Sequence, residues 1–362
     1  MNASATIRAS YVRASIMNTR PVQLSSMPRI QELESRPAHN HKLANFQPVN
    51  HLQHREECER ERQEAEAPPP YFPDDGQSYP SNSFMDFDDE EASSDFGIRL
   101  RKMYTIFPYR DPIYLVAVAF ALGSVDLVIN AFFDLLPRTI PETSFETEET
   151  IAVPTTVLIG STLFLIAGIL DSFGALNADR GTLQTSKDVE STHTRTEYKP
   201  ALLGSKEWAW IPSRGKFTDL LFGNLAFQAG LIVLFGGIIF MVAGITDFPG
   251  VIPEDSTFFG LVVFGPQVVH GFMFLVANGM LAIYEQERWW KPKVLDADWQ
   301  GAFLNAVGGF GFLMAGFFLF RREDLAAAVA AMGGSWAFLV GSLVRWYAVM
   351  DFVASIILCV AT

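Results

Sequence analysis

The sequence is poor in cysteine and in charged residues. Of its 362 residues, 19% are charged and two are cysteines, Cys58 and Cys359. These two lie far apart in the chain, so the sequence predicts no disulfide framework. The formal net charge of −13 argues against a nucleic-acid partner, because nucleic-acid binding depends on basic residues that neutralise phosphates.

The motifs of common catalytic and metal sites are also missing. The chain has no phosphate-binding glycine loop, no cysteine and histidine zinc cluster, no His-Glu-x-x-His helix and no Gly-x-Ser-x-Gly elbow. Only His270, of six histidines, falls in a long apolar run. A bis-histidine haem or a three-ligand metal site would therefore lack partners in a membrane. We expect no metal, no cofactor and no enzymatic activity.

Six long apolar runs follow residue 110, and together they exclude a soluble globular fold. Each can cross the ~30 Å hydrocarbon core of a bilayer as a helix. Helix starts are indicated by Asp111 with Pro112, and by capping residues before four later runs: Asp219, Ser256, Asp298 and Asp324. The sequence predicts an all-α integral membrane protein, a six-helix transmembrane bundle in a lipid bilayer. The runs are 113–136, 153–176, 220–245, 258–284, 302–320 and 325–344.

The first 110 residues differ in composition from the rest. They are rich in Ser, Pro, Gln, Glu and Asp, and such a segment buries too little apolar surface to offset its chain entropy. We predict a long disordered N-terminal tail. The predicted organisation is a cytosolic tail (1–110), a first membrane hairpin (111–176), a cytoplasmic loop (177–217), a middle helix pair (218–286), a second hairpin (299–346) and an interfacial C-terminal segment (347–362).

One short motif in the tail has a known recognition chemistry. Pro68, Pro69, Pro70 and Tyr71 form Pro-Pro-x-Tyr, in which a stiff polyproline segment offers its prolines to an aromatic groove. The pattern resembles the WW-domain ligands through which cytosolic tails recruit ubiquitin ligases of the HECT class. The alternative is a solvated, proline-rich spacer.

Basic residues near the runs predict the orientation of the chain in the membrane. The loop after the second run holds seven basic residues between Arg180 and Lys216, whereas the loops predicted on the other side hold few, the Arg321 and Arg322 turn being the exception. Positive loops stay in the cytoplasm, so both termini are predicted to be cytoplasmic. The N-terminal segment forms only a poor amphipathic face, which favours the plasma membrane or an endomembrane over mitochondria.

The second and sixth runs share a sequence pattern. Residues 160–168 align without gaps with 334–342, and the runs before them match more loosely, which predicts a duplicated two-helix hairpin around a middle pair. Residues 305–318 with 334–342 resemble the YrhK-like family of two-helix membrane domains, found in bacteria and in larger fungal membrane proteins. That resemblance implies architecture and assigns no activity. The small residues Gly333, Ala337 and Gly341 form a stripe that could pack against a second copy in a homo-oligomer.

Polar residues inside the runs are the candidate functional residues. Asp126 and Asn130 share one face of the first predicted helix, and Gln267 and His270 lie close to one face of the fourth. With Gln228 of the third they would line a polar core. One hypothesis is a proton or cation site, with Asp126 as carboxylate and His270 as its titrating partner, since imidazole titrates near neutrality. The other is a structural role, in which these polar side chains hydrogen-bond the helices to one another.

Asp171 and Arg345 form a second candidate group. The repeat alignment makes them equivalent, so they could pair across a pseudo-symmetric interface; alternatively both reach the headgroup region. Two functions follow from the whole sequence. One is a structural or organising membrane protein whose tail binds a WW-domain partner. The alternative is a small transporter or channel for protons, cations or a small solute near Asp126 and His270.

Overall fold

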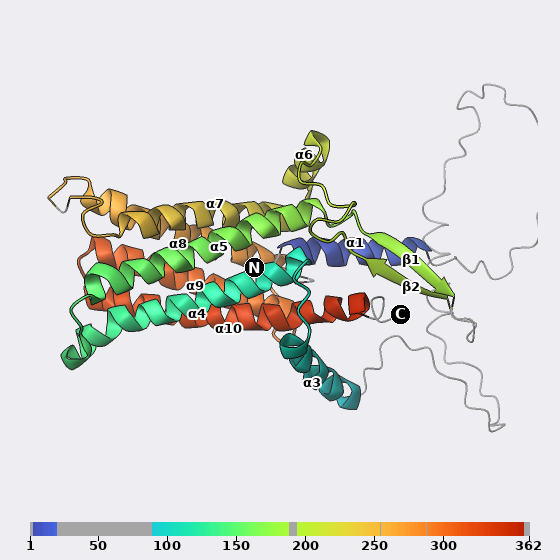
Figure 1. Ribbon diagram of the computed structural model, residues 1–362, viewed down its shortest axis with the longest axis horizontal. Coiled ribbons are helices and arrows are strands. Elements are labelled where there is room, and N and C mark those ends of the chain that lie inside the picture. The colour runs from blue at the N-terminus through green and yellow to red at the C-terminus, as the bar shows by residue number, and fades with distance from the viewer. Residues whose placement is uncertain (1–2, 20–88, 188–193, 254, 287, 358–362) are drawn as a thin grey trace, which may run out of the picture. The chain divides into compact units, whose positions relative to one another are not determined.

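The structure, a computed structural model, describes residues 3–19, 89–187, 194–253, 255–286 and 288–357. The Pro-Pro-x-Tyr motif lies outside the described residues. Six helices of the described chain are long and apolar enough to cross a membrane, which confirms a multi-pass membrane protein (Figure 1). They are α4 (Pro112–Thr139), α5 (Val153–Leu176), α7 (Leu225–Thr246), α8 (Phe259–Tyr284), α9 (Ala297–Phe320) and α10 (Asp324–Ile357).

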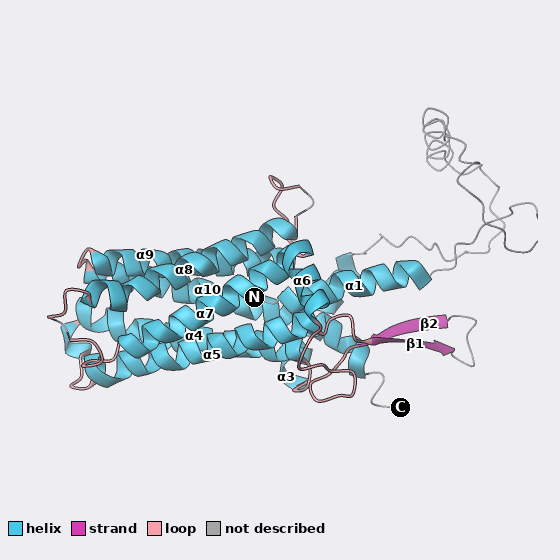
Figure 2. Cartoon of the chain, turned by 90° about the horizontal axis from the view of Figure 1, so that it is seen from above, coloured by secondary structure: helices cyan, strands magenta, loops and turns pink. Residues whose placement is uncertain are grey.

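The remaining elements do not span the length of the bundle. Two helices come from the N-terminal region. A two-stranded antiparallel sheet and a short helix follow α5 and precede α7 in the sequence (Figure 2). They are α1 (Ala3–Thr19), α3 (Asp89–Thr105), β1 (Thr182–Lys187), β2 (Thr194–Lys199) and α6 (Arg214–Gly223), with a 3-10 turn at Pro141–Thr143 and a π-helical turn at Glu148–Ala152. The strands pair Thr182 with Lys199 at one end and Lys187 with Thr194 at the other.

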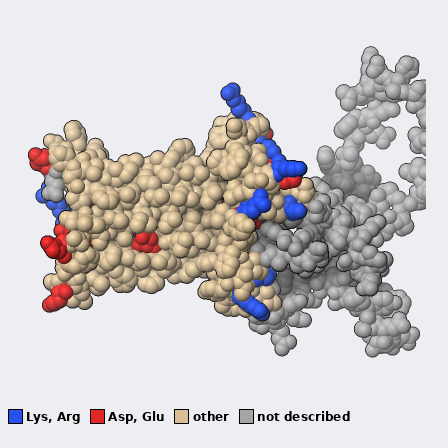
Figure 3. All heavy atoms as spheres, in the orientation of Figure 1, with Lys and Arg blue, Asp and Glu red and all other residues tan. Residues whose placement is uncertain are grey.

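The six spanning helices close into a ring in chain order. Each packs against its neighbours in sequence, from α4 and α5 through α7, α8, α9 and α10, and α10 packs back against α4. The face of the ring seen in Figure 3 is apolar, with an acidic patch at mid-length. Lys and Arg gather at the end near α1, α3 and α6, which we call the basic end. The opposite end, formed by residues 140–152, 247–253, 255–258 and 321–323, carries Asp and Glu beside a few Arg and is called the acidic end.

The third and fifth spanning helices are capped by residues other than those the sequence predicted. Asp111 does cap α4, accepting a hydrogen bond from the amide of Ile113 at 3.0 Å. The third span, however, begins five residues later than predicted, because residues 214–223 form the separate helix α6 and Asn224 caps α7. Asp296, not Asp298, caps α9. In each case a side-chain oxygen accepts from an amide of the first turn, which has no partner within its own helix.

A layer of six phenylalanines fills the middle of the ring, one from each spanning helix. Each is at most 9% exposed, and Phe164 contacts four of the others edge to face, at centroid distances of 5.0 to 5.9 Å. Edge-to-face contacts set the positive edge of one ring against the negative face of another. The phenylalanine layer thus joins all six helices. Its members are Phe120, Phe164, Phe240, Phe274, Phe312 and Phe338.

The two hairpins predicted to be duplicates share matching glycine and phenylalanine contacts. A Cβ atom added at Gly123 of α4 would lie 2.8 Å from the ring of Phe164 in α5. One added at Gly308 of α9 would lie 2.7 Å from the ring of Phe338 in α10. The two equivalent phenylalanines also contact each other, with centroids 5.5 Å apart. In both hairpins, therefore, a glycine on the first helix leaves room for a phenylalanine ring of the second helix to reach the centre of the bundle.

Both ends of the chain contain helical segments that the sequence did not predict. The region predicted as a disordered tail contains α1 and α3, and Ala3 to Arg8 are buried against the bundle. Its composition cannot form a core alone, but the bundle supplies the partner surface, which is how most helices in proteins are stabilised. At the other end α10 runs unbroken to Ile357, where an interfacial segment from residue 347 was predicted.

The closest packing between helices occurs where α8 meets α9. Cβ atoms added at Gly271 and at Gly309 would overlap the backbones of Leu313 and Leu275 on the facing helix. Backbone atoms cannot rotate away as side chains can. The two helices therefore depend on glycine at both positions.

We predict that Gly309→Ala lowers the free energy of unfolding by about 1–3 kcal/mol, the usual cost of overpacking, because the added methyl group forces α8 and α9 apart. Gly279→Ala in α8 is the matched control, since a Cβ there meets nothing within 4 Å. Thermal unfolding in detergent measures both. Equal midpoints for the two variants would contradict the close approach.

Candidate functional site

A cavity of about 260 Å³ lies inside the acidic half of the ring. All six spanning helices contribute to its wall, so it lies along the axis of the bundle. It reaches from charged residues at the acidic end inward to His270, Phe240 and Phe312. Because a water molecule in the liquid occupies about 30 Å³, the cavity has room for several waters or one small solute.

The mouth of the cavity is negatively charged. Three carboxylates and one guanidinium line it: Asp134, Glu149, Asp247 and Arg138. Arg138 pairs with Asp134 at 2.8 Å and lies 3.7 Å from the Asp324 carboxylate at the start of α10. The excess of carboxylates favours cations at this entrance.

One carboxyl of this mouth, that of Asp247, has a raised pKa. Asp247 follows the last residue of α7, and burial, with a smaller contribution from the charge of Asp134, raises the pKa of its carboxyl to about 6. The cause is that burial disfavours the charged form, and a neighbouring like charge does the same. The negative charge of the mouth therefore increases as the pH rises through about 6.

His270 forms the floor of the cavity. It is 1% exposed, and its Nδ1 lies 3.1 Å from the carbonyl oxygen of Pro266. A carbonyl only accepts hydrogen bonds, so Nδ1 carries the hydrogen and Nε2 keeps its lone pair. Nε2 is buried and has no hydrogen-bond partner in the described part of the chain. The residue thus presents a proton-accepting atom inside the ring.

Aromatic rings hold the imidazole in place. It stacks on Phe240 with centroids 4.2 Å apart and planes at 12°, and it contacts Phe274 and Phe312 at 5.9 Å. These three rings belong to the phenylalanine layer, so His270 lies on the acidic side of that layer. An aromatic face can also stabilise a positive charge placed over it.

Three of the five predicted polar residues do line this cavity: Asn130, Gln267 and His270. The amide of Asn130 donates to the Val153 carbonyl at 2.9 Å and to the Thr156 hydroxyl at 2.8 Å. It therefore fixes α4 to the start of α5. The helix α8 continues without a break through Pro266, whose carbonyl contacts His270.

The other two predicted residues lie elsewhere. Asp126 does not line the cavity. It is half-buried at the seam between α4 and α5, where a Cβ at Gly160 would lie 2.9 Å from its Oδ2. Gln228 lies in the first turn of α7, near the basic end, and donates to the Leu221 carbonyl at 2.8 Å. The cause is that α6 ends and α7 begins at Asn224, which places Gln228 at the start of a helix and not in the predicted polar core.

Asp171 and Arg345 each have a partner other than the one predicted. Asp171 accepts from the backbone amides of Ala3 and Ser4, and Arg345 donates to the Asp298 carboxylate at 2.6 Å. In the proposed oligomer stripe, Gly341 packs against Asn305 of the same chain, whereas Gly333 is open.

Sequence reasoning missed the phenylalanine layer and the charged mouth. The layer has one ring on each helix and so gives no local motif, although the aligned Phe164 and Phe338 were a partial signal. Comparison of the chain with protein-family models, with curated proteins and with solved structures gave no match. Membership of the YrhK-like family stays a prediction.

We predict that Asp247→Asn raises the thermal unfolding midpoint by a few degrees at pH 7.5. The carboxyl binds its proton more tightly in the folded chain, where its pKa is about 6, than at its ordinary value of 3.8, so its ionisation opposes folding as the pH rises from about 4 through 6. Unfolding scans from pH 4 to 8 should show the difference shrinking towards pH 4.

The exposed Asp255 of the same loop provides the control variant, Asp255→Asn, which should not change the midpoint. A constant gain for Asp247→Asn across the whole pH range would contradict the assigned protonation.

Proposed function

We propose that the protein is a small transporter or channel that carries protons or small cations through the axis of the six-helix ring. The observation that supports this proposal is the position of His270, whose proton-accepting Nε2 is buried at the floor of a cavity with an acidic mouth. We also propose that the basic end faces the cytoplasm, following the distribution of Lys and Arg. The cavity would then open to the lumen or the exterior.

The acidic mouth and the histidine perform successive steps in this proposal. Carboxylates at the entrance raise the local concentration of cations. A proton from the cavity would bind Nε2 of His270, while the hydrogen on Nδ1 stays with the Pro266 carbonyl. The imidazolium formed in this way is stabilised by the face of Phe240, on which the ring stacks.

The phenylalanine layer provides the barrier of the proposed pathway. It is closed around Phe164, which is 0% exposed, and buried rings offer no hydrogen bonds to a hydrated ion. Passage therefore requires the rings to move. They can do so by changing rotamer, because the side chains of a packed core adopt a small set of discrete rotamers.

Polar groups continue on the basic side of the layer. His270, Phe274 and Asn278 follow one another at four-residue spacing on α8, so they share one face. Asn278 Oδ1 and both side-chain polar atoms of Asn305 in α9 are buried and without a hydrogen-bond partner among the described residues. A proton or small cation that crosses the layer would meet these groups next.

The test is proton flux into sealed vesicles that contain the purified protein, driven by a pH gradient and followed with a pH-sensitive dye. His270→Gln keeps a polar side chain but removes the titrating nitrogen, so we expect at least a tenfold loss of flux. Asp126→Asn, outside the cavity, is the control and should keep the wild-type rate. Absence of flux in the wild type under every gradient would overturn the transport function.

The tail motif supports a second proposal, a structural or organising role in which a WW-domain ubiquitin ligase is recruited. It rests on the sequence of residues 68–71. Tyr71→Ala should reduce binding of a WW domain to the full-length protein at least tenfold, because the tyrosine fills a pocket beside the proline groove. Tyr79→Ala, a tail tyrosine outside the motif, is the control in a pull-down or calorimetric titration. Equal binding by both variants would rule the motif out.

A further inference from the structure

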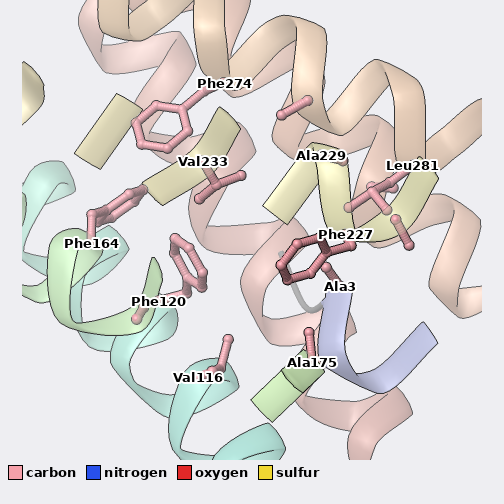
Figure 4. Packing of buried hydrophobic residues seen from close by; sticks show 14 of the residues in the cluster. Ala3, Val116, Phe120, Phe164, Ala175, Phe227, Ala229, Val233, Phe274 and Leu281 are labelled. Carbon is pink, nitrogen blue, oxygen red and sulfur yellow. The ribbon is translucent and has the colours of Figure 1, made fainter. Parts of the chain in front are cut away.

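The first turn of α1 lies inside the basic end of the ring. Ala3 and Ser4 are 1% and 0% exposed, and Figure 4 shows Ala3 among Ala175, Phe227 and Ala229. Ala3 and Ile7 also belong to the same buried cluster as Phe164. The basic end of the axis is therefore filled by a segment from the far N-terminal region.

Two glycines make room for this turn. A Cβ added at Gly230 of α7 would lie 3.0 Å from the Cβ of Ala3, and one added at Gly174 of α5 would lie 2.9 Å from the Cβ of Ser4. Both distances are shorter than ordinary carbon contacts of about 3.5–4.0 Å. The surface that receives α1 is thus shaped to its small first residues.

A buried carboxylate binds the end of α1. Asp171, which is 0% exposed, accepts from the amide of Ala3 at 2.9 Å and from that of Ser4 at 2.8 Å. The first amides of a helix lack partners within it and carry its positive dipole end. A carboxylate buried in the bundle needs such donors, so Asp171 and α1 stabilise each other.

Two further polar contacts hold the next turn. The Arg8 guanidinium donates to both oxygens of Asp111, at 2.8 and 3.0 Å, and the two residues are 4% and 1% exposed. The Thr6 hydroxyl donates to Glu285 at 3.0 Å. Three carboxylates, from the residue that caps α4, from α5 and from the residue that follows α8, thus bind the first two turns of α1.

We propose that α1 is a plug that closes the basic-end mouth of the pathway, and that its withdrawal opens this side. The inference rests on the proposed transport function. The phenylalanine layer and α1 form two successive barriers, while the acidic-end cavity leads to the first of them. Residues 20–88 separate α1 from α3, and a connection of this length does not limit a movement of one or two helical turns.

The first experiment measures the position of α1 without measuring transport. In the full chain with Cys58→Ser and Cys359→Ser, a reporter Ala175→Cys is treated from the basic-end side with a charged, membrane-impermeant thiol reagent. Ala175 is 2% exposed and should label slowly. Arg8→Glu places two carboxylates against each other, so we expect labelling at least tenfold faster. Arg101→Glu, on the exposed face of α3, is the charge-matched control and should label at the slow rate.

A second variant covers the case in which Arg8→Glu does not fold. Ala3→Trp alters only the tip of α1, which then no longer fits against Gly230, so the reporter should again label at least tenfold faster. Fast labelling without either substitution, or slow labelling in every folded variant, overturns the plug.

The last experiment connects the plug to transport. In the same cysteine-free background, Ala3→Cys with Gly230→Cys places two thiols close enough to be joined by mild oxidation. We expect the oxidised protein to lose proton flux to the level of empty vesicles and to regain it on reduction. Flux that persists in the cross-linked protein overturns the plug and leaves the transport function intact. Absence of flux in the wild type overturns the transport function, and the labelling rates then decide the plug alone.

Discussion

The contact among six phenylalanines is the constraint on which the rest of this bundle depends. Lipid supplies no hydrophobic drive for helices to associate, because its chains are as apolar as leucine. A ring of six helices therefore needs tight contacts at its centre. Phe164, fully buried and in contact with rings from α4, α7, α8 and α10, provides them. The phenylalanine layer divides the axis of the bundle into an acidic half, which holds the cavity, and a basic half, which holds the first turn of α1.

Small residues let the rings and helices of this central layer pack closely, and buried polar residues lie on either side of it. Glycines at 123 and 308 admit the rings of Phe164 and Phe338, and those at 271 and 309 let α8 and α9 approach to backbone contact. Buried polar groups are costly in a membrane and need partners. Asp111, Asp171 and Arg345 have them. His270 Nε2 and the side chains of Asn278 and Asn305 keep atoms that have no partner among the residues the structure describes, and these flank the layer on its two sides.

The sequence predicted the spans well because their signals are local. Apolar length places each helix, Asp111 with Pro112 starts the first, and the aligned hairpins predicted the equivalent positions of Phe164 and Phe338. His270 could be singled out because it is a membrane-embedded histidine. Asp126 was assigned to the site on helical spacing alone, and spacing does not tell which face of α4 points inward. Gln228 was misplaced because the break at Asn224 lies inside one continuous apolar run.

The role of α1 was beyond sequence reasoning for a different physical reason. Taken alone, α1 has too few apolar residues to form a core of its own, so its composition favours disorder. Its stability comes from Asp171, Asp111 and the glycines of distant helices, and only the folded bundle brings these together.

The most direct test of the central claim is the proton leak of Phe164→Ala, with folded protein isolated by size exclusion and sealed in vesicles. Removing the ring leaves a gap where the rings of four helices meet. If the phenylalanine layer is the barrier, Phe164→Ala combined with Ala3→Trp, which displaces the tip of α1, should conduct protons at least tenfold faster than Ala3→Trp alone. Equal rates for the two folded variants would contradict the account.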